Sequence, residues 1–593
     1  MLTQPGTNDP QSLLNRYEQA RALTILLLVS FTCLAVIPLL IVGVRAAEAL
    51  TFYFAFRQDS LLVPVFLAAM LLRPQPTNGE RSEWLSGGAL ALGLSALVIL
   101  AAGWAGHYLV FQDYDLSRDE QLAVFDQGIF AHGKLFWPIL PEWRGLVDAL
   151  NRRFLLPISG DEIWVSGYLP VHAAFRALVS LFADSALSSP ILAVLAAGSL
   201  WSVTRRLWPD SQWTSIVALV LLVTSSQFLI TAMTAFSMTM HLALNLLWLA
   251  LFLRDRWPTH AAAAAVGFLA TGIHQPLFHP LFVLPFMLLL LGQRRWSVVA
   301  FYALAYGLIA VFWLWWPLFI SSHGTAVTAA ECLNQACSSG GGGFLDRLSG
   351  ILNSSQTVLQ HVCLMAENLL RFAVWQHPLL LPLAAFAGIS CWKADPLVRA
   401  LTVGLILPIP VLAVLLPWQG HAWGYRYLHP VLGNAVLLAC YGFKALEDGG
   451  VTVRRPLIIT TAVAVVLLGV HSWMAAQLTA PFVQTRKELA SLRADVVIVD
   501  AATVPFAEDV VFNRFDLSNR PMLLLADKIK PEQLPAICKR STIAFYEAQQ
   551  FANLSRLFVW RDPTEPTAKA RALRKIAEAA GCHIVRSGNR PAN

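Results

Sequence analysis

The sequence is poor in charge. Asp, Glu, Lys and Arg make up 13% of its 593 residues, whereas hydrophobic residues make up 56% and the mean hydropathy is +0.57. Soluble domains carry about 25% charged residues and do not need so much apolar side chain. Apolar runs of about 20 residues recur, and each can cross the roughly 30 Å hydrocarbon layer as a helix. The shortage of charge therefore excludes a soluble protein and predicts an all-α multi-pass membrane protein.

Other absences narrow the class further. The first apolar run, 22–44, lacks a small-x-small cleavage site and is too long for a signal-peptide core, so it is expected to stay as a spanning helix. No Gly-Lys-Ser/Thr follows the glycines at 340–343, which favours a flexible hinge or lid over a phosphate-binding loop. The formal charge of +7 needs no nucleic acid, because basic cytoplasmic loops account for it.

Hydropathy predicts about thirteen spans. The second contains Arg57 and Asp59 near its start. The predicted spans are 22–44, 51–72, 87–110, 189–204, 213–232, 238–253, 260–276, 277–292, 297–319, 378–392, 400–417, 428–443 and 456–477.

Basic residues fall on alternate short loops, and such loops mark the cytoplasmic side. They are Arg73, Arg81, Arg205, Arg206, Arg254, Arg256, Arg294, Arg295, Lys393, Arg399, Arg454 and Arg455. This pattern predicts an inner (plasma) membrane protein with a cytoplasmic amino terminus. It places 111–188, 320–377, 418–427 and everything after 478 outside the cytoplasm.

The composition changes near 484, which divides the chain into a membrane domain, 1–478, and a small external α/β domain, 479–593. Buried strands are predicted at 496–499, 522–526 and 557–560, and a helix at 569–580. An oxidising compartment would allow disulfides there, and pairing of Cys332 with Cys337 or of Cys538 with Cys582 stays open.

The longest early polar segment opens with a cluster of carboxylates directly after the third apolar run. They are Asp113, Asp115, Asp119, Glu120 and Asp126. Ser117-x-x-Glu120 is a capping box, which predicts a helix from Arg118. Its apolar stripe, Leu122, Phe125 and Ile129, suggests a helix that lies on the membrane surface. A second amphipathic stretch is expected at 171–182.

Acid–base catalysis needs a carboxylate with access to substrate, and a membrane boundary supplies that access. Asp119 is the first candidate for a general base, ahead of Asp113, and Glu120 is either catalytic or only a helix cap. Asp113, Asp115 and Asp119 could instead hold a divalent metal ion.

A second candidate segment, 419–430, carries Arg426 between aromatic residues on an external loop. A guanidinium at the lipid boundary suits a lipid phosphate, with Tyr425 and Tyr427 beside it. The alternative is plain interfacial anchoring. Among the histidines, His274 and His172 are candidates for substrate contact, whereas His241 is expected to be structural.

Three passages resemble the GT-C superfamily of glycosyltransferases, notably the protein O-mannosyltransferase and aminoarabinose transferase group. They are 118–135 with its leading Asp-Glu, 168–175, and 424–430 with its Arg-Tyr-x-x-Pro pattern. The resemblance implies a polyprenyl-phosphate sugar donor, an active site on the outer face and an acidic catalyst in the first external loop. Carried over, Asp119 is the catalytic residue and Arg426 contacts the donor phosphate.

The leading hypothesis is therefore a glycosyltransferase that moves a sugar, with inversion, to a hydroxyl of a lipid, glycan or protein. An O-antigen ligase or polymerase is the first alternative, although its main loop usually comes late and is rich in Arg and His. A lipid-binding transporter is the second, although buried mid-membrane charges and repeated halves are not evident in the sequence.

Overall fold

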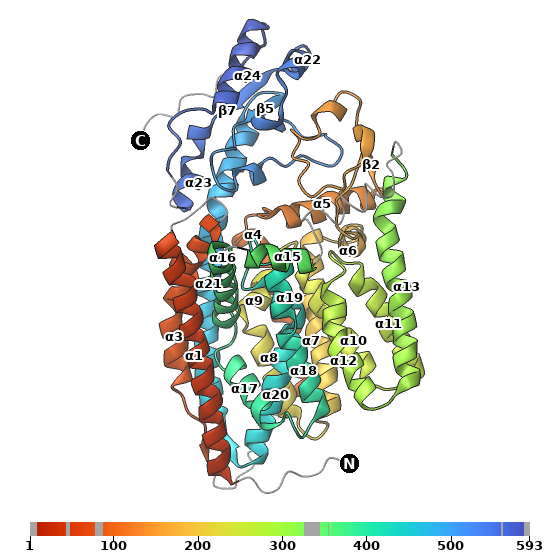
Figure 1. The fold of residues 1–593 in the computed structure, drawn as a ribbon, viewed down its shortest axis with the longest axis vertical. Coiled ribbons are helices and arrows are strands. Elements are labelled where there is room, and N and C mark those ends of the chain that lie inside the picture. The colour runs from red at the N-terminus through yellow and green to blue at the C-terminus, as the bar shows by residue number, and fades with distance from the viewer. Residues whose placement is uncertain are drawn as a thin grey trace.

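The computed structural model describes residues 9–42, 48–76, 87–324, 344–353, 355–558 and 561–585. An elongated bundle of helices holds most of the chain, and a smaller α/β cap lies at one end of it (Figure 1). The segment that follows α4 (Gly88–Leu109) lies between the bundle and this cap, so it is enclosed on two sides (Figure 1).

Besides α4, the bundle is built from helices, one π-turn and one 3₁₀ turn. These are α1 (Pro10–Val42), α2 (Ala49–Phe54), η2 (Ala55–Asp59), α3 (Ser60–Met70), α7 (Ser188–Leu207), α8 (Gln212–Val223), α9 (Ser226–Ala232), α10 (Met238–Phe252), α11 (Trp257–Thr271), α12 (Phe278–Gly292), α13 (Trp296–Ser321), α15 (Phe344–Leu352), α16 (Ser355–Val374), α17 (Leu380–Ser390), α18 (Pro396–Ile406), α19 (Pro408–Leu415), η6 (Arg426–Val431), α20 (Leu432–Asp448) and α21 (Arg454–Ser491).

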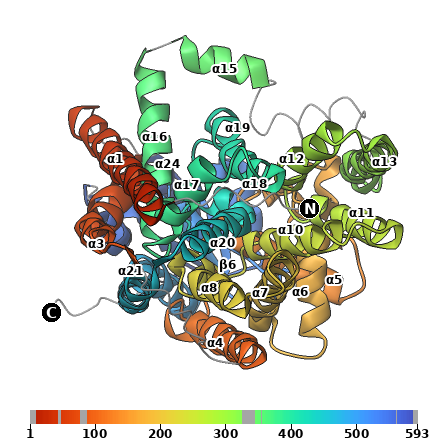
Figure 2. The ribbon, with the colours of Figure 1, turned by 90° about the horizontal axis from the view of Figure 1, so that it is seen from below.

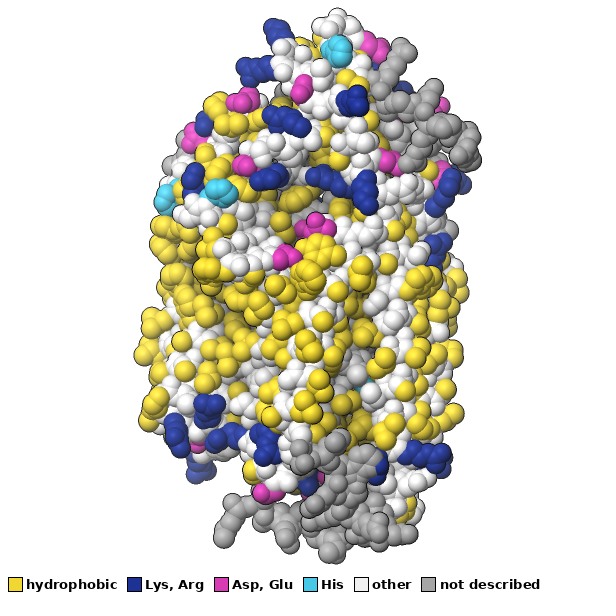
Figure 3. All heavy atoms as spheres, turned by 180° about the vertical axis from the view of Figure 1, so that it is seen from behind, with side chains coloured by type: hydrophobic (Ala, Val, Ile, Leu, Met, Phe, Trp, Pro, Cys, Tyr) yellow, Lys and Arg dark blue, Asp and Glu magenta, His cyan; other side chains and the backbone are white. Residues whose placement is uncertain are grey.

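Six of the described helical segments are long and apolar enough to cross a membrane, and the bent pair α8–α9 is a seventh candidate. Large apolar side chains face outward on them, such as Leu97 on α4 (63% exposed) and Leu304 on α13 (67% exposed). Such a surface suits lipid rather than water. Figure 3 shows the resulting hydrophobic belt between two bands of Lys and Arg. The multi-pass membrane class is thus supported.

The thirteen predicted spans are not all present as full-length helices. Those predicted at 238–253, 277–292 and 378–392 are α10, α12 and α17, each shorter than a straight helix needs to cross a bilayer. Around α20, the elements pack as a protein core rather than against lipid: α20 lies near the middle of the bundle, with α8, α17 and α18 packed on it (Figure 2). Short, buried helices are the consequence.

The predicted external segment 320–377 contains a helix that hydropathy did not reveal. The 20 residues of α16 pack along α1. Glu367 and Arg371 lie in its last turns and are buried. Because a span is recognised by an uninterrupted apolar run, these charges hid a helix that belongs to the bundle.

The loop after α4 folds into elements of its own. They are α5 (Arg118–Ala131), β2 (Trp137–Pro138), η3 (Arg144–Leu146), η4 (Ser159–Asp161), β3 (Ile163–Trp164), α6 (Val171–Ser180) and η5 (Ser185–Leu187). The predicted helix start at Arg118 is confirmed: Glu120 N donates to Ser117 Oγ at 3.2 Å, and Ser117 N donates to Glu120 Oε2 at 3.0 Å. The second amphipathic stretch is α6, close to its predicted place.

The apolar stripe of α5 does not face the membrane. Leu122, Phe125 and Ile129 share one buried cluster with Phe515 and the sheet of the cap. At Gly128 of the same helix, a Cβ atom would lie 2.4 Å from the Phe515 ring. The prediction of a membrane-surface helix is therefore wrong, because amphipathicity shows that one face is buried but not what buries it.

The cap contains a parallel sheet in the order β6–β5–β7, formed by β5 (Val496–Val499), β6 (Met522–Leu525) and β7 (Ile543–Tyr546). Both faces are covered, as expected of a parallel sheet: Val496 and Ile498 face α5, and Val497 and Val499 belong to the cluster that includes α21. The helical elements of the cap are η7 (Ala507–Val510), η8 (Ala526–Lys528), η9 (Pro531–Gln533), α22 (Leu534–Cys538), η10 (Ala548–Phe551), α23 (Ala552–Leu557) and α24 (Ala568–Ala579).

The strands predicted at 496–499 and 522–526 are present as β5 and β6, and the helix predicted at 569–580 is α24. The third strand of the sheet is β7, and not the strand predicted at 557–560. Leu557 ends α23, and 559–560 lie outside the described residues. The predicted boundary at 478 falls within α21, which continues to Ser491.

Cys538 and Cys582 form a disulfide. Cys332, Cys337 and the glycine run at 340–343 lie outside the described residues. A short ladder, β1 (Gln75–Pro76) with β4 (Val451–Thr452), ties loops at the far end of the bundle.

Candidate active site

Asp119 lies in the first turn of α5, where the enclosed loop meets the bundle. Its carboxylate forms an ion pair with Arg426, 307 residues further along the chain, and accepts a hydrogen bond from the Tyr168 hydroxyl. The side chains of Asp119 and Arg426 are only 13% and 9% exposed. Both residues were named from the sequence as separate candidates, and tertiary folding brings them into contact.

The Asp119 carboxylate is ionised in this arrangement. Burial alone would raise its pKa, but the Arg426 guanidinium, His274 and the Tyr168 hydroxyl outweigh burial and lower the pKa to about 2. The helix amino terminus favours the same charged form. Asp119 is therefore ionised, and the positive charge of Arg426 neutralises it.

Arg426 is enclosed by aromatic rings and a short polar shell. Its guanidinium lies 4.8 Å from the centre of the Tyr427 ring and 5.3 Å from that of Phe236, and Nη2 donates to the Tyr427 hydroxyl at 3.0 Å. Its backbone N donates to Gln419 Oε1 at 3.0 Å. Arg426 Nε and Gln419 Nε2 are buried without a hydrogen-bond partner among the described residues.

Other residues that the sequence suggested for the site have different contacts from those of Asp119 and Arg426. Glu120 caps α5, and burial together with Asp115 raises its pKa to about 8. Asp113 is 73% exposed at its side chain and lies 3.0 Å from His107 Nε2. Tyr425 is in the core, with its hydroxyl 4.0 Å from the Met365 sulfur.

The suggested metal site is not supported. Asp119 pairs with Arg426, whereas Asp113 and Asp115 both lie near His107. In the part of the chain that the structure describes, no group of three or more His, Cys, Asp or Glu side chains is arranged to hold a metal ion. Closeness in sequence misled here, because successive residues in a turn and the first turn of a helix point in different directions.

Two histidines named from the sequence lie beside the pair or near it. The His274 ring stacks on Tyr168 with ring centres 3.9 Å apart. Both nitrogens of His274 and Nε2 of His172 are buried without partners among the described residues. His241, expected to be structural, has unpartnered nitrogens as well. Because buried polar groups normally find a partner, this concentration indicates a place where a polar ligand or water binds.

The segment that carries Arg426 is held from behind by the bundle. Arg371 donates to the carbonyls of Ala422 at 3.0 Å and Gly424 at 3.3 Å, and Gln227 Nε2 donates to the carbonyl of Tyr425 at 2.9 Å. Gly424 has φ +67°, and a Cβ there would lie 2.4 Å from Gln227 Oε1. Only glycine fits this position without displacing the segment.

A second ion pair underlies that support, and the sequence reading missed it. Arg371 Nη1 lies 3.0 Å from Asp59 Oδ2, and both side chains are fully buried. Trp375 Nε1 donates to Asp59 Oδ1 at 2.7 Å, and the Arg371 guanidinium lies 3.6 Å from the Phe54 ring centre. Asp59 lies in the π-turn η2. One signal in the sequence could have revealed this ion pair: an ionisable residue lies inside an apolar run, and such a residue needs a partner within the membrane.

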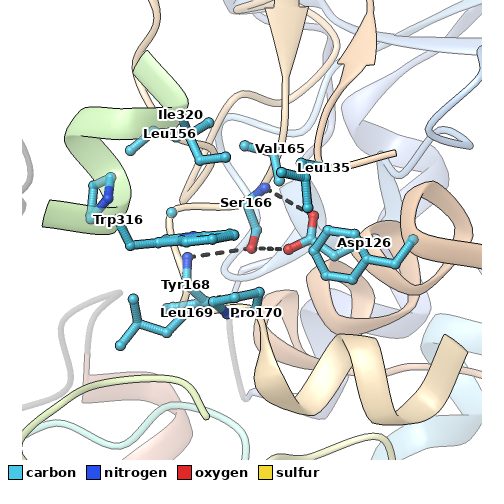
Figure 4. Close-up of a pocket in the computed structure, with 13 residues that line it drawn as sticks. Asp126, Leu135, Leu156, Val165, Ser166, Tyr168, Leu169, Pro170, Trp316 and Ile320 are labelled. Carbon is cyan, nitrogen blue, oxygen red and sulfur yellow. Dashed lines mark hydrogen bonds between the residues drawn. The ribbon is translucent and has the colours of Figure 1, made fainter. Parts of the chain in front are cut away.

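A small cavity adjoins the pair. It is lined by Tyr168, Trp316, Asp126 and Ser166 among others, and its volume is about 10 Å³, roughly the space of one water (Figure 4). Asp126 accepts hydrogen bonds from Ser166 Oγ at 2.5 Å and Ser166 N at 3.0 Å. Burial raises the pKa of Asp126 to about 7, against the effect of these bonds. Tyr168 lines the cavity with its ring while its hydroxyl reaches Asp119, so cavity and ion pair are neighbours.

No protein-family model and no curated protein matches this sequence. Among solved structures, the chain is similar to ArnT from Cupriavidus metallidurans in the apo state, with a TM-score of 0.43 and 13% identity over 73% of this chain and 85% of that one. The structure of ArnT bound to undecaprenyl phosphate gives a TM-score of 0.43 and 12% identity with the same coverage.

The apo oligosaccharyltransferase of Archaeoglobus fulgidus is similar at a TM-score of 0.39 and 12% identity, over 68% of this chain and 58% of that one. ArnT is an aminoarabinose transferase, of the group that the sequence motifs resemble.

Proposed function

We propose that this protein is a membrane glycosyltransferase that moves a sugar from a polyprenyl-phosphate carrier to a hydroxyl group of an acceptor. The observation that carries the proposal is the buried contact between Asp119 and Arg426 where the enclosed loop meets the bundle. A carboxylate suited to act as a base and a guanidinium suited to a phosphate lie together beside apolar helices that face lipid.

Arg426 binds the donor phosphate in this proposal. A guanidinium offers two parallel N–H donors that match phosphate oxygens, and this one has an unpartnered Nε among its described neighbours. The phosphate thereby binds the same guanidinium whose positive charge now neutralises Asp119. Once Arg426 is shared with phosphate, we expect the pKa of Asp119 to rise from about 2 towards the range of a usable base.

The transfer is a single displacement at the anomeric carbon. The acceptor oxygen forms a bond to that carbon while the bond from the carbon to the phosphate oxygen breaks, and the electron pair leaves with polyprenyl phosphate. The acceptor proton moves to the Asp119 carboxylate. Because the leaving group is already a stable anion, charge stabilisation by Arg426 serves it better than an acid would. Attack from the face opposite the leaving group inverts the configuration.

Two observations support an outer-face location. The Cys538–Cys582 disulfide lies in the cap that covers Asp119, and disulfides persist in oxidising compartments. The short basic loops between α7 and α8, α10 and α11, and α12 and α13 lie at the other end of helices that meet the loop, as the positive-inside rule requires of cytoplasmic loops.

The test is transfer of a labelled sugar from a polyprenyl-phosphate donor by the purified full chain in lipid vesicles. We expect Asp119→Asn to lower turnover by about 10²–10⁴-fold, because the acceptor proton loses its base. Arg426→Gln should weaken retention of polyprenyl phosphate itself. Asp148→Asn is the matched control, since this carboxylate lies in the same loop but is 69% exposed and contacts Arg152.

Full turnover in both site variants would overturn the residue assignment. Labelling of a cysteine placed in 113–126 by a membrane-impermeant reagent from the cytoplasmic side alone would overturn the outer-face location. No retention of any polyprenyl phosphate by the wild-type chain would contradict the donor class.

A further inference from the structure

A cleft lies at the end of the bundle opposite Asp119. It has a volume of about 450 Å³ and is bounded by two turns, one between α10 and α11 and the other between α12 and α13. The far end of α13 lines the small cavity beside Tyr168, and its 26 residues span about 39 Å. That distance places the cleft at the other membrane interface, and Figure 3 shows a band of Lys and Arg at the lower end of the hydrophobic belt.

The cleft carries a surplus of positive charge. Arg295 Nη2 lies 2.6 Å from Asp255 Oδ1, and the same oxygen lies 3.1 Å from His260 Nε2, so Asp255 offsets only one cation. Arg256 and Arg294 also line the cleft, and neither forms an ion pair within the described residues. Two guanidinium groups are therefore available to an anion.

The backbone adds to this field. α11 and α13 both begin at the cleft, with Trp257 and Trp296 as their first residues. A helix amino terminus carries a partial positive charge. Trp296, Ser297 and Val298 of the first turn of α13 line the cleft, whereas the first turn of α11 contains Pro258, which has no N–H to donate. The combined arrangement suits a phosphate group.

The rim indicates where that phosphate comes from. Trp257 and Trp296 are 55% and 62% exposed, and exposed tryptophans at a membrane boundary sit among lipid headgroups. Directly along α13, Leu304 is 67% exposed on the lipid-facing surface. A ligand that entered from this side would bring an apolar tail as well as a charged head.

We propose that this cleft binds the phosphate of an anionic phospholipid in the leaflet opposite the Asp119 site. Arg256 and Arg294 contact the phosphate oxygens, the first turn of α13 faces it, and Trp257 and Trp296 flank the glycerol region. The site is independent of the proposed transfer reaction, because it lies at the other interface and shares no residue with it.

The test measures lipid retained by the purified full chain in detergent, by native mass spectrometry, after titration with phosphatidylglycerol or phosphatidylcholine. We expect phosphatidylglycerol to be retained preferentially. The double variant Arg256→Gln/Arg294→Gln should weaken this retention about thirtyfold, since each basic residue near an anionic lipid contributes about a fivefold factor. Both side chains are exposed, so folding is expected to survive the change.

The matched control is Lys393→Gln/Arg455→Gln, which removes the same charge from exposed positions that do not line the cleft. This control should retain phosphatidylglycerol as the wild type does. Equal losses in the two double variants would show a diffuse charge effect and overturn the site. Equal retention of phosphatidylcholine, or displacement of the lipid by millimolar inorganic phosphate, would overturn the assignment to an anionic lipid.

Discussion

Among the described residues, the ion pairs Asp59–Arg371 and Asp119–Arg426 are both largely buried but differ in their surroundings. Arg371 Nη1 also lies 3.9 Å from the buried Glu367 Oε1. Every guanidinium nitrogen of Arg371 has an acceptor, in Gln58, Asp59 or the carbonyls of Ala422 and Gly424. Arg426, by contrast, keeps an unpartnered Nε among the described residues. Its carboxylate partner lies beside a cavity and an unpartnered His274.

This difference distinguishes support from reactivity. A buried charge whose bonds are all satisfied rigidifies its neighbourhood and has nothing left to offer a ligand. A buried charge with bonds left open, next to other unpartnered polar atoms, keeps capacity for a ligand. Arg371 thus holds the segment that presents Arg426, and Arg426 is the residue available to a substrate.

The largest expected effect contrasts the two arginines directly. Arg371→Met leaves Asp59 buried without its cation and two carbonyls without a donor, and should cost about 3–5 kcal/mol of folding stability. Arg426→Met should cost less than half of that, because Asp119 keeps the Tyr168 hydroxyl and a polar cavity lies nearby. Thermal unfolding of each purified variant, followed by the loss of monodisperse protein in detergent, measures the difference. Equal falls in stability would remove the distinction between the pairs.

The next prediction tests whether the segment that carries Arg426 must stay in the position in which Arg371 and Gln227 hold it. Gly424→Ala places a Cβ against Gln227 at a backbone conformation with φ +67°, and so displaces the segment that carries Arg426. We expect turnover in the transfer assay to fall by about 10- to 100-fold, since small misplacements of a binding group are costly. Gly133→Ala is the control, because it has φ +70° with nothing within 4 Å of its Cβ. If both alanine variants lost activity to the same degree, general backbone strain and not the link would be responsible.

The effect that is smallest per pH unit extends the comparison to Asp126, a buried carboxyl without an ion-pair partner among the described residues. Within the part of the chain that the structure describes, the Asp126 carboxyl is hydrogen-bonded to Ser166 alone, and burial raises its pKa to about 7 from 3.8. The folded state therefore binds a proton that the unfolded state has released between these values. Stability from Asp126 is fully present below pH 3.8 and is lost as the pH rises through about 7.

Asp126→Asn should remove this loss and make the fall in stability with pH shallower, by at most about 1.4 kcal/mol per pH unit. The measurement is the unfolding temperature of wild type and variant between pH 4 and pH 8. Parallel curves would show that Asp126 is not the titrating group. Glu120, whose pKa is raised to about 8, should keep part of the slope in the variant.

Local patterns allowed much of the fold to be predicted. Apolar run length identified the membrane class, the Ser117–Glu120 capping box identified the start of α5, and continuous apolar stretches identified β5 and β6. Each of these signals is complete within a few residues or one helix length. The failures came where burial was provided by protein instead of lipid: α16 was missed because its charges are paired inside the bundle, and the α5 stripe was assigned to the membrane instead of the cap.

The sequence by itself determined that Asp119 and Arg426 stand at polar edges of apolar helices, because residue type and hydropathy are local properties. Only the tertiary structure decided that they form a pair, that Arg371 and Asp59 support the segment behind them, and that a basic cleft lies at the opposite interface. Contacts between residues hundreds of positions apart depend on how helices pack, and no pattern within one segment encodes the partner that packing brings to it.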